Sequence, residues 1–384
     1  GELTDHGRNS MVQLGRDLRE QYITGLSLLP SMLSNPSYVY FRSSPFPRAL
    51  ESLQHVIWGM FPPESRTPDF GSVNIVQRGE RDETLLPNED YCVRFIQIFK
   101  AYTERASNRW NNSDEMKYIN ALIGKYVPQG LITVAGAPKI HAIYDIITST
   151  LATDNIRLPE AFYDEKLGDI VDRLAYNEEF GSYGENKEMR TVGIGAMLAD
   201  VVERVVSKVE HEAISASQAC STNDDYTEST GVESNGTKLW LYGSHDSTLG
   251  AVMAGLGADE VIEGECRWPP YGSVLAVEVF RDMKDEGIIS QPTSSVPGFL
   301  SDMRHHPISR TPTRRLSQAQ KARLRNYYIR LRYNNRSLTI PGCKLAGKNW
   351  NEDATFCTLE AFKEIVDHFT PSNWRRECGQ NLSK

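Results

Sequence analysis

An apolar run that ends in a histidine and an aspartate is the feature that most constrains the fold of this chain. Residues 239–242, Leu-Trp-Leu-Tyr, form the kind of run that makes a strand buried in a parallel sheet. A Gly-Ser pair ends the run, and apolar residues at helical spacing follow from Asp246 onward. His245 and Asp246 thus stand where a strand passes into a helix, at the edge of an α/β sheet where ligands bind. Because a helix N-terminus attracts anions, the pair indicates phosphate chemistry, and a helix cap beside a surface histidine is the alternative interpretation.

A second segment repeats this pattern of strand, polar residues and helix. Residues 39–41, Val-Tyr-Phe, predict a strand that ends in Arg42, and an apolar helix follows after a few small polar residues. The planar, permanently charged guanidinium group matches the oxygens of a phosphate. If the two strands are neighbours, Arg42, His245 and Asp246 form a phosphate-binding group. Arg48, at the start of the following helix, is interpreted as a surface or structural salt-bridge residue.

Strand and helix patterns alternate toward both ends of the chain and predict an α/β fold that is interrupted by an insertion. From Cys92 to about Glu185 the spacing of apolar residues is mostly helical. We therefore expect a discontinuous core of residues 1–90 and 186–384 and a helical cap of residues 91–185. Residues 215–238 and 283–325, which are rich in polar residues or in Pro, Ser and basic residues, are expected to be flexible insertions. The strand near residues 276–279 is expected to form a hairpin with residues 327–333.

Several motifs together resemble those of the histidine acid phosphatases, the second branch of the histidine phosphatase superfamily. The motifs are Gly1-Glu-Leu-Thr-Asp-His-Gly7, Phe41-Arg-Ser-Ser-Pro-Phe-Pro-Arg48, Tyr242-Gly-Ser-His-Asp-Ser-Thr-Leu249, Trp268-Pro-Pro-Tyr-Gly-Ser273, Ile340-Pro-Gly-Cys343, Cys357-Thr-Leu-Glu-Ala-Phe362 and Trp374-Arg-Arg-Glu-Cys378. Asn35-Pro36 and Leu86-Pro-Asn88 resemble the lysophosphatidic acid phosphatases and their fungal relatives. The resemblance implies a phosphoglycerate-mutase-like core, with a mostly parallel sheet flanked by helices, and an inserted, mainly helical cap domain.

The resemblance also implies an acid phosphatase that works in two steps. A histidine nucleophile takes the phosphoryl group from a phosphate monoester, and water then hydrolyses the phosphohistidine. Carried over by position, Arg42 and His245 bind the phosphate, and Asp246 is the general acid that protonates the leaving alcohol. Fixed positive charge stabilises the transferring phosphoryl group, and a carboxylic acid can donate its proton in an acidic medium. No metal or other cofactor is expected.

The nucleophile of that mechanism has no counterpart in the sequence. The family's RHGxRxP motif precedes the segment with which this chain begins, and no Arg-His-Gly occurs in the 384 residues. The nearest imitation contains His6, but Thr4 or Asp5 is better interpreted as the cap of a helix that begins there. We therefore expect an enzyme that lacks its N-terminal strand and loop, so that the chain as given is inactive. The alternative is a pseudophosphatase that binds a phosphorylated ligand without turnover, while a serine hydrolase is disfavoured because the G-x-S-x-G motif is absent.

Charge and hydropathy limit the partners of the chain. A net charge of −8 argues against general binding of nucleic acid, and no apolar run approaches the roughly 18 residues of a membrane-spanning helix. The expected partner is a small phosphomonoester. The subfamily similarity points to a lysophospholipid, and phytate, a sugar phosphate or a phosphoprotein stay open. The sequence indicates no oligomeric state.

The six cysteines of the chain indicate the compartment in which it works. The family resemblance implies the disulfides Cys92–Cys378 and Cys343–Cys357, whereas Cys220 and Cys266 have no family counterpart and pair only by default. Disulfides favour the secretory pathway, either extracellular or vacuolar-lysosomal, and a mitochondrial location is the alternative. Four glycosylation sequons, compatible with a glycoprotein, occur at Asn111, Asn235, Asn335 and Asn381.

Overall fold

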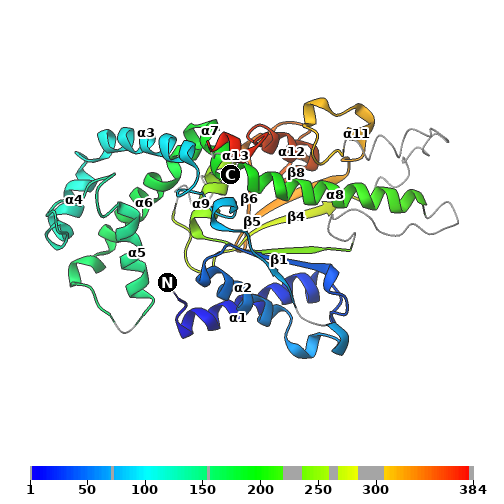
Figure 1. Ribbon diagram of the computed structural model, residues 1–384, viewed down its shortest axis with the longest axis horizontal. Coiled ribbons are helices and arrows are strands. Elements are labelled where there is room, and N and C mark those ends of the chain that lie inside the picture. Colours follow the sequence, from blue (N-terminus) through cyan, green and yellow to red (C-terminus); the bar gives the residue numbers. More distant parts are fainter. Residues whose placement is uncertain are drawn as a thin grey trace. The chain divides into compact units, whose positions relative to one another are not determined.

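In a computed structural model, the chain forms a parallel sheet, an antiparallel sheet and a large number of helices (Figure 1). The structure describes residues 2–70, 73–153, 156–218, 236–258, 267–283 and 307–379. The chain divides into two compact units. The α/β unit consists of Gly1–Arg78, Gly195–Gly243 and Val274–Thr370, and the helical unit consists of Gly79–Ile194, Ser244–Ser273 and Pro371–Lys384.

The parallel sheet of the α/β unit contains both apolar runs that were predicted as strands. Strand β1 Val39–Ser43 lies between β2 Ile75–Val76 and β3 Leu239–Gly243. Val39 lies opposite Leu239 and Ser43 lies opposite Gly243, so that β1 and β3 are neighbours in register. Because the strands are parallel, their carboxyl ends lie at the same edge of the sheet.

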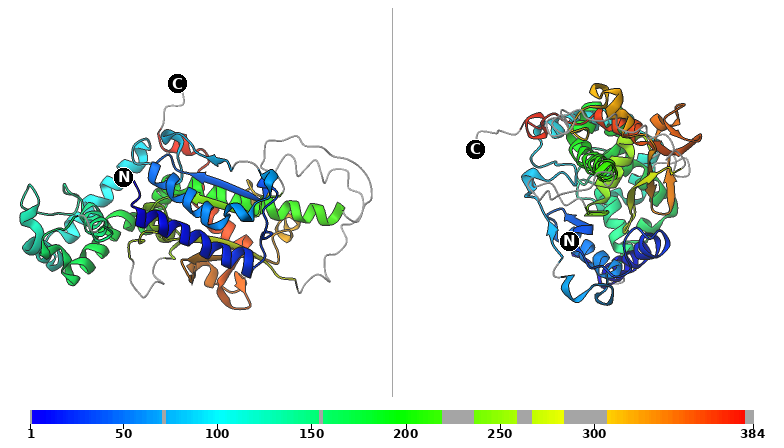
Figure 2. Two further views of the ribbon diagram at one scale, coloured as in Figure 1. Left: turned by 90° about the horizontal axis from the view of Figure 1, so that it is seen from below. Right: turned by 90° about the vertical axis from the view of Figure 1, so that its right-hand side faces the viewer.

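Helices α1 Asp5–Arg19 and α2 Pro47–Met60 belong to the same unit and lie side by side in both views (Figures 1 and 2). Glycines make their close approach possible. A Cβ atom on Gly15 would lie 2.2 Å from the carbonyl oxygen of Val56, and one on Gly59 would lie 2.1 Å from that of Val12. Any larger residue at these two positions would force the helices apart.

The antiparallel sheet completes the α/β unit. Its strands are β4 Leu275–Arg281, β5 Tyr327–Tyr333, β6 Arg336–Leu338, β7 Asn349–Trp350 and β8 Asp353–Thr358, in the order β4-β5-β8-β7 with β6 paired to β5. Strands β4 and β5 pair along their whole length, which confirms the expected pairing of residues 276–279 with 327–333. The unit also contains the helices α8 Ala196–Gln218, α11 Gln318–Ala322 and α12 Leu359–Asp367.

The helical unit consists mainly of long helices. They are α3 Val93–Trp110, α4 Asp114–Ile123, α5 Ile140–Leu151, α6 Glu165–Glu185, α7 Lys187–Arg190, α9 Asp246–Leu256 and α13 Trp374–Glu377. Short 3-10 and π turns occur in both units, at Glu20–Gly25, Pro36–Tyr38, Pro63–Ser65, Pro68–Phe70, Glu80–Asp82, Gly124–Tyr126, Glu160–Tyr163, Thr191–Gly195, Thr313–Arg315 and Pro341–Lys344.

The α/β fold class with a helical insertion is confirmed. Of the two insertions expected to be flexible, residues 219–235 and 284–306 lie outside the described residues. Residues 307–325 contain α11 and bury Ile308 and Leu324. Among the helices that the structure describes, none has both the length and the apolar character needed to span a bilayer.

Candidate active site

Arg42 lies near the carboxyl end of β1, the middle strand of the parallel sheet. Its side chain is 0% exposed, and the residue lies opposite Val76 on β2 and Tyr242 on β3. Just beyond it, the backbone N–H of Ser44 donates to the carbonyl oxygen of Gly243 at 3.0 Å, which holds the two strand ends together. A guanidinium group stays charged in a protein, so burial at this depth requires polar or anionic groups around it. The burial therefore fits a residue that holds an anion.

Arg48 has a different environment from the one that the sequence suggested. It lies in the first turn of α2, it is exposed, and its guanidinium lies 4.9 Å from the ring centre of Phe46. The expected salt bridge is absent among the described residues. A cation in the first turn of a helix opposes the helix dipole, so its position is unfavourable unless an anion is nearby. Arg48 is thus a second candidate ligand for phosphate, at the helix that follows β1.

His245 and Asp246 begin helix α9 in the helical unit. His245 is the N-cap residue with extended backbone angles, and its backbone N–H donates to Oγ1 of Thr248 at 3.3 Å. The Thr248 hydroxyl donates in turn to the carbonyl oxygen of Leu85, which anchors this end of the helix. The helix cap considered from the sequence is therefore present, and the His245 residue at its N-cap position is half-buried.

Both carboxylate oxygens of Asp246 accept a hydrogen bond. Oδ1 accepts from the backbone N–H of Ser247 at 2.9 Å, and Oδ2 accepts from the indole Nε1–H of Trp268 at 2.8 Å. Trp268 is only 6% exposed. The amino-acid sequence carries no signal for this contact, because the two residues are 22 positions apart and the tryptophan stands out only as part of a family motif.

Trp268 is itself held on several sides within the helical unit. Its ring centre lies 6.1 Å from that of His141, 5.4 Å from that of Tyr144 and 4.9 Å from that of Phe180. Its backbone N–H donates to Oδ1 of Asp172 at 2.8 Å. Burial raises the pKa of Asp172, although this N–H and the neighbouring arginine favour its charged form. The indole therefore has a fixed position against α5 and α6.

The imidazole of His141 contacts two buried acids, Glu178 and Glu179. Nδ1 of His141 is 3.2 Å from Oε2 of Glu178 and 3.5 Å from Oε2 of Glu179. Glu178 also accepts the backbone N–H of His141 at 3.0 Å, at the start of α5. Burial and the negative charge of Glu89 raise the pKa of Glu179 to about 7, against the opposing charges of His141 and Lys139.

The remaining histidine considered as a nucleophile lies elsewhere. His6 is exposed in the first turn of α1, which is capped by Thr4 through a 3.0 Å bond from the Gly7 N–H to Oγ1 of Thr4. His6 is thus on a helix and does not follow a strand of the parallel sheet. Within the described part of the chain, no three His, Cys, Asp or Glu side chains form a group that could hold a metal ion.

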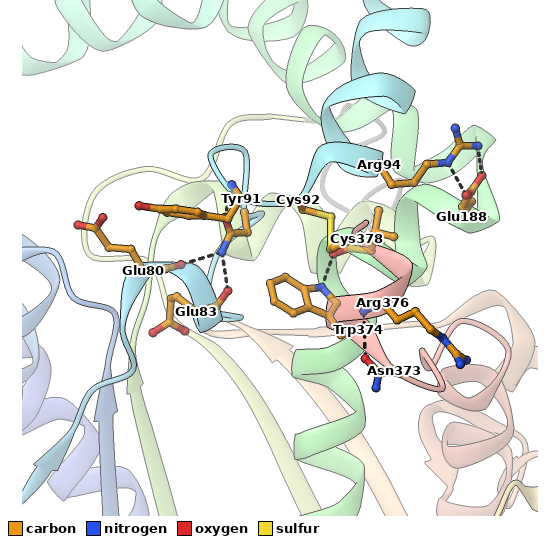
Figure 3. The surroundings of a disulfide bond; sticks show 12 residues. Glu80, Glu83, Tyr91, Cys92, Arg94, Glu188, Asn373, Trp374, Arg376 and Cys378 are labelled. Atoms are coloured by element: carbon orange, nitrogen blue, oxygen red, sulfur yellow. Dashed lines mark hydrogen bonds and ion pairs between the residues drawn. A yellow bond between two sulfur atoms is a disulfide. The ribbon is translucent and has the colours of Figure 1, made fainter. Parts of the chain in front are cut away.

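Both disulfides that the resemblance implied are present. Cys343–Cys357 lies in the α/β unit, and Cys92–Cys378 joins the start of α3 to the end of α13 in the helical unit (Figure 3). The Nε1–H of Trp374 donates to the carbonyl oxygen of Val192 at 2.8 Å beside this second bridge. Cys220 and Cys266 lie outside the described residues.

The four sequons differ in their surroundings. Asn335 is exposed in the turn between β5 and β6, whereas Oδ1 of the half-buried Asn111 accepts the backbone N–H of Val134 at 2.8 Å. Asn235 and Asn381 lie outside the described residues.

Comparisons with known proteins agree with this architecture. The chain is 29% identical to a probable acid phosphatase of Schizosaccharomyces pombe over an alignment of 392 residues. The alignment covers 98% of this chain and 76% of that relative. It is 23% identical to the lysophosphatidic acid phosphatase type 6 of Bos taurus over 73% of this chain and 57% of that protein. The fold is similar to that of Hafnia alvei phytase, with a TM-score of 0.59 and 12% identity over 98% of this chain and 88% of the phytase. The family model of the histidine phosphatase superfamily (branch 2) matches residues 1–334, and the chain therefore belongs to that superfamily.

Proposed function

We propose that this protein is an acid phosphatase that hydrolyses small phosphate monoesters through a phosphohistidine intermediate. The observation that carries the proposal is the position of the His245–Asp246 pair, which begins a helix directly after β3, the strand paired in register with the strand of Arg42. In this arrangement Arg42 and His245 bind phosphate and Asp246 acts as the general acid. Membership in the superfamily supports the phosphatase chemistry.

The reaction is a double displacement at phosphorus. In the first step a histidine nitrogen forms a bond to phosphorus, the bond to the ester oxygen breaks, and the proton of Asp246 passes to the leaving alcohol. In the second step water attacks phosphorus, the N–P bond breaks, and Asp246 takes up a proton from the water. Positive charge on Arg42 and His245 stabilises the negative oxygens in both transition states.

The attacking histidine is the one part of this reaction to which no residue is assigned. None of the 384 residues lies in an Arg-His-Gly motif. A pseudophosphatase, which binds a phosphorylated ligand through Arg42 and His245 without turnover, is therefore the second candidate function.

We propose that the helical unit acts as the cap that selects the leaving group. Similarity to a lysophosphatidic acid phosphatase supports a lysophospholipid among the candidate substrates. The two buried disulfides support an oxidising compartment such as the secretory pathway or the lysosome.

The test of the general acid compares an aryl phosphate with an alkyl phosphate between pH 4 and 7. Asp246→Asn should lower kcat/KM for the alkyl ester by about a hundredfold or more and that for the aryl ester far less, because only a poor leaving group needs a proton. An equal loss for both esters would contradict the role of Asp246. Absence of turnover in the unaltered chain, with phosphate still bound, would fit both a phosphatase whose nucleophile is not among these 384 residues and the pseudophosphatase.

The test of the phosphate ligands measures the dissociation constants of phosphate and vanadate. Arg42→Ala should weaken both about tenfold to a hundredfold, as expected for losing a charged hydrogen bond. Arg48→Ala shows whether the exposed arginine of α2 contributes, and Arg16→Ala, at an exposed position on α1, is the matched control. Unchanged affinity in Arg42→Ala would remove Arg42 from the site.

A further inference from the structure

We propose that Trp268 is a positioning residue for the general acid: its indole N–H holds the Asp246 carboxylate in the orientation from which it protonates the leaving alcohol. This inference rests on the proposed phosphatase function. The residues that it concerns all lie in the helical unit.

The carboxylate of Asp246 is held at both of its oxygens. One oxygen of Asp246 is bonded to the N–H of Ser247 at 2.9 Å and the other to Nε1 of Trp268 at 2.8 Å. The bond to the adjacent residue alone leaves the carboxylate free to turn about it. The second bond, from a different segment of the chain, fixes the plane of the group.

The donor of the second bond, the indole of Trp268, has a chemistry suited to this role. An indole N–H can only donate a hydrogen bond, so it cannot take the proton that Asp246 must deliver. A hydroxyl group or a histidine in its place could exchange that proton. Tryptophan therefore orients the acid without competing for its proton.

The indole of Trp268 is itself held rigidly by its surroundings. The indole is packed among the rings of His141 and Tyr144 from α5 and Phe180 from α6, and its backbone is bonded to Asp172. Groups that take part in catalysis act best when surrounding packing and hydrogen bonds fix them. Helices α5 and α6 thereby determine where the catalytic carboxylate lies.

The experiment compares three Trp→Phe variants, each of which removes one indole N–H and keeps an aromatic ring. Trp268→Phe removes the bond to Asp246. Trp350→Phe removes an indole–aspartate bond of the same 2.8 Å length, to Asp282 in the α/β unit, and Trp374→Phe removes the bond to the Val192 carbonyl in the helical unit. We expect Trp268→Phe to lower kcat/KM for an alkyl phosphate about tenfold to a hundredfold and that for an aryl phosphate far less. In Trp268→Phe the inhibition constant of inorganic phosphate should stay close to that of the unaltered protein. In Trp350→Phe and Trp374→Phe, kcat/KM for both esters should stay close to the unaltered values.

A second measurement examines the contact without turnover. In the protein labelled with ¹⁵N-tryptophan, the indole N–H resonance that is missing in Trp268→Phe should shift in Asp246→Ala, and the resonances of Trp350 and Trp374 should not. No shift at Trp268 would overturn the inference.

The kinetic outcomes separate this inference from the function on which it rests. If Asp246→Asn discriminates between the two esters and Trp268→Phe does not, Trp268 has no positioning role and the phosphatase stands. If the unaltered protein hydrolyses neither ester, hydrolysis by this chain is contradicted, and the resonance of Trp268 alone decides whether it orients Asp246.

Discussion

At the scale of single residues, the close contact between α1 and α2 depends on Gly15 and Gly59, which carry a hydrogen atom where other residues carry a Cβ. Gly59→Ala should destabilise the protein by about 1–3 kcal/mol, because its Cβ would lie 2.1 Å from the carbonyl oxygen of Val12 and both helices would have to move. The free energy of unfolding in urea measures this loss.

Gly168 in α6 provides the matched control. It is also inside a helix, but apart from its chain neighbours and the backbone of its own helix no atom lies within 4 Å of the position that its Cβ would occupy. Gly168→Ala should therefore stabilise the protein by about 0.5–1 kcal/mol through helix propensity. Equal effects of the two substitutions would show that the close approach of α1 and α2 does not depend on glycine.

Residue types near strand ends were the most predictable part of the candidate site. Arg42, His245 and Asp246 were found because each follows an apolar run, and the structure places these runs on adjacent strands. Trp268 was missed, since a hydrogen bond between its indole and Asp246 leaves no periodic pattern in a sequence. Arg48 is exposed, but the salt bridge expected for it is absent among the described residues, because an exposed arginine and an ion-paired one look alike in a sequence.

At the scale of elements, the contact between α5 and α6 has a built-in dependence on pH. Burial raises the pKa of Glu179 to about 7, so that between about pH 4.5 and 7 the folded protein binds more protons at this group than the unfolded chain. The free energy of unfolding must then fall as the pH rises through that range. Burial lowers the pKa of His141, but the hydrogen bond with Glu178 and the charges of Glu179 and Glu178 outweigh it, so that the pKa is raised overall. Because the folded protein then holds the proton of His141 to a higher pH than the unfolded chain, the loss of stability with rising pH continues above pH 6.5.

Glu179→Gln should remove the part of this dependence that belongs to the carboxyl group. Between pH 4.5 and 7 the variant should lose about 1–3 kcal/mol less stability than the unaltered protein. Thermal unfolding at pH 4.5, 6 and 8 measures the difference, with Glu104→Gln on the exposed side of α3 as the control. Parallel pH curves for Glu179→Gln and the unaltered protein would contradict this account.

Elements with a clear periodicity were predicted well. Every second residue of β5 is buried, and β5 pairs with β4 as the sequence analysis expected for residues 327–333 and 276–279. Strands β2, β6 and β7 were not predicted, because two or three residues are too short to show a period. Their positions depend on pairing with longer strands.

At the scale of the whole molecule, the grouping of distant segments depends on contacts that no local pattern reveals. Residues Ser244–Ser273 and Pro371–Lys384 belong to the helical unit with Gly79–Ile194. Hydrogen bonds such as that from Trp374 to Val192 connect these segments across 182 positions. The family resemblance implied one such connection, the disulfide between Cys92 and Cys378, which periodicity alone could not provide.

That disulfide should fix the C-terminal segment of the helical unit. It spans 286 positions, and the hydrogen bond of Trp374 to Val192, the ion pair of Arg375 with Asp82 and the hydrogen bond from the Arg94 N–H to the carbonyl oxygen of Cys378 also anchor this segment. Replacing both cysteines by serine should lower the free energy of unfolding by about 2–5 kcal/mol, since a long loop in the unfolded chain is no longer closed. Amide hydrogen exchange should increase in residues 371–379 and at the start of α3.

The disulfide of the α/β unit separates this local effect from a general loss of stability. Cys343→Ser with Cys357→Ser opens a bridge that spans only 14 positions, and it should destabilise the protein by about 3 kcal/mol at most. Because Cys343 and Cys357 belong to the other unit, residues 371–379 should keep their protection in this variant. If both double variants expose the C-terminal segment equally, or if neither does, the Cys92–Cys378 bridge is not what holds that segment to the helical unit.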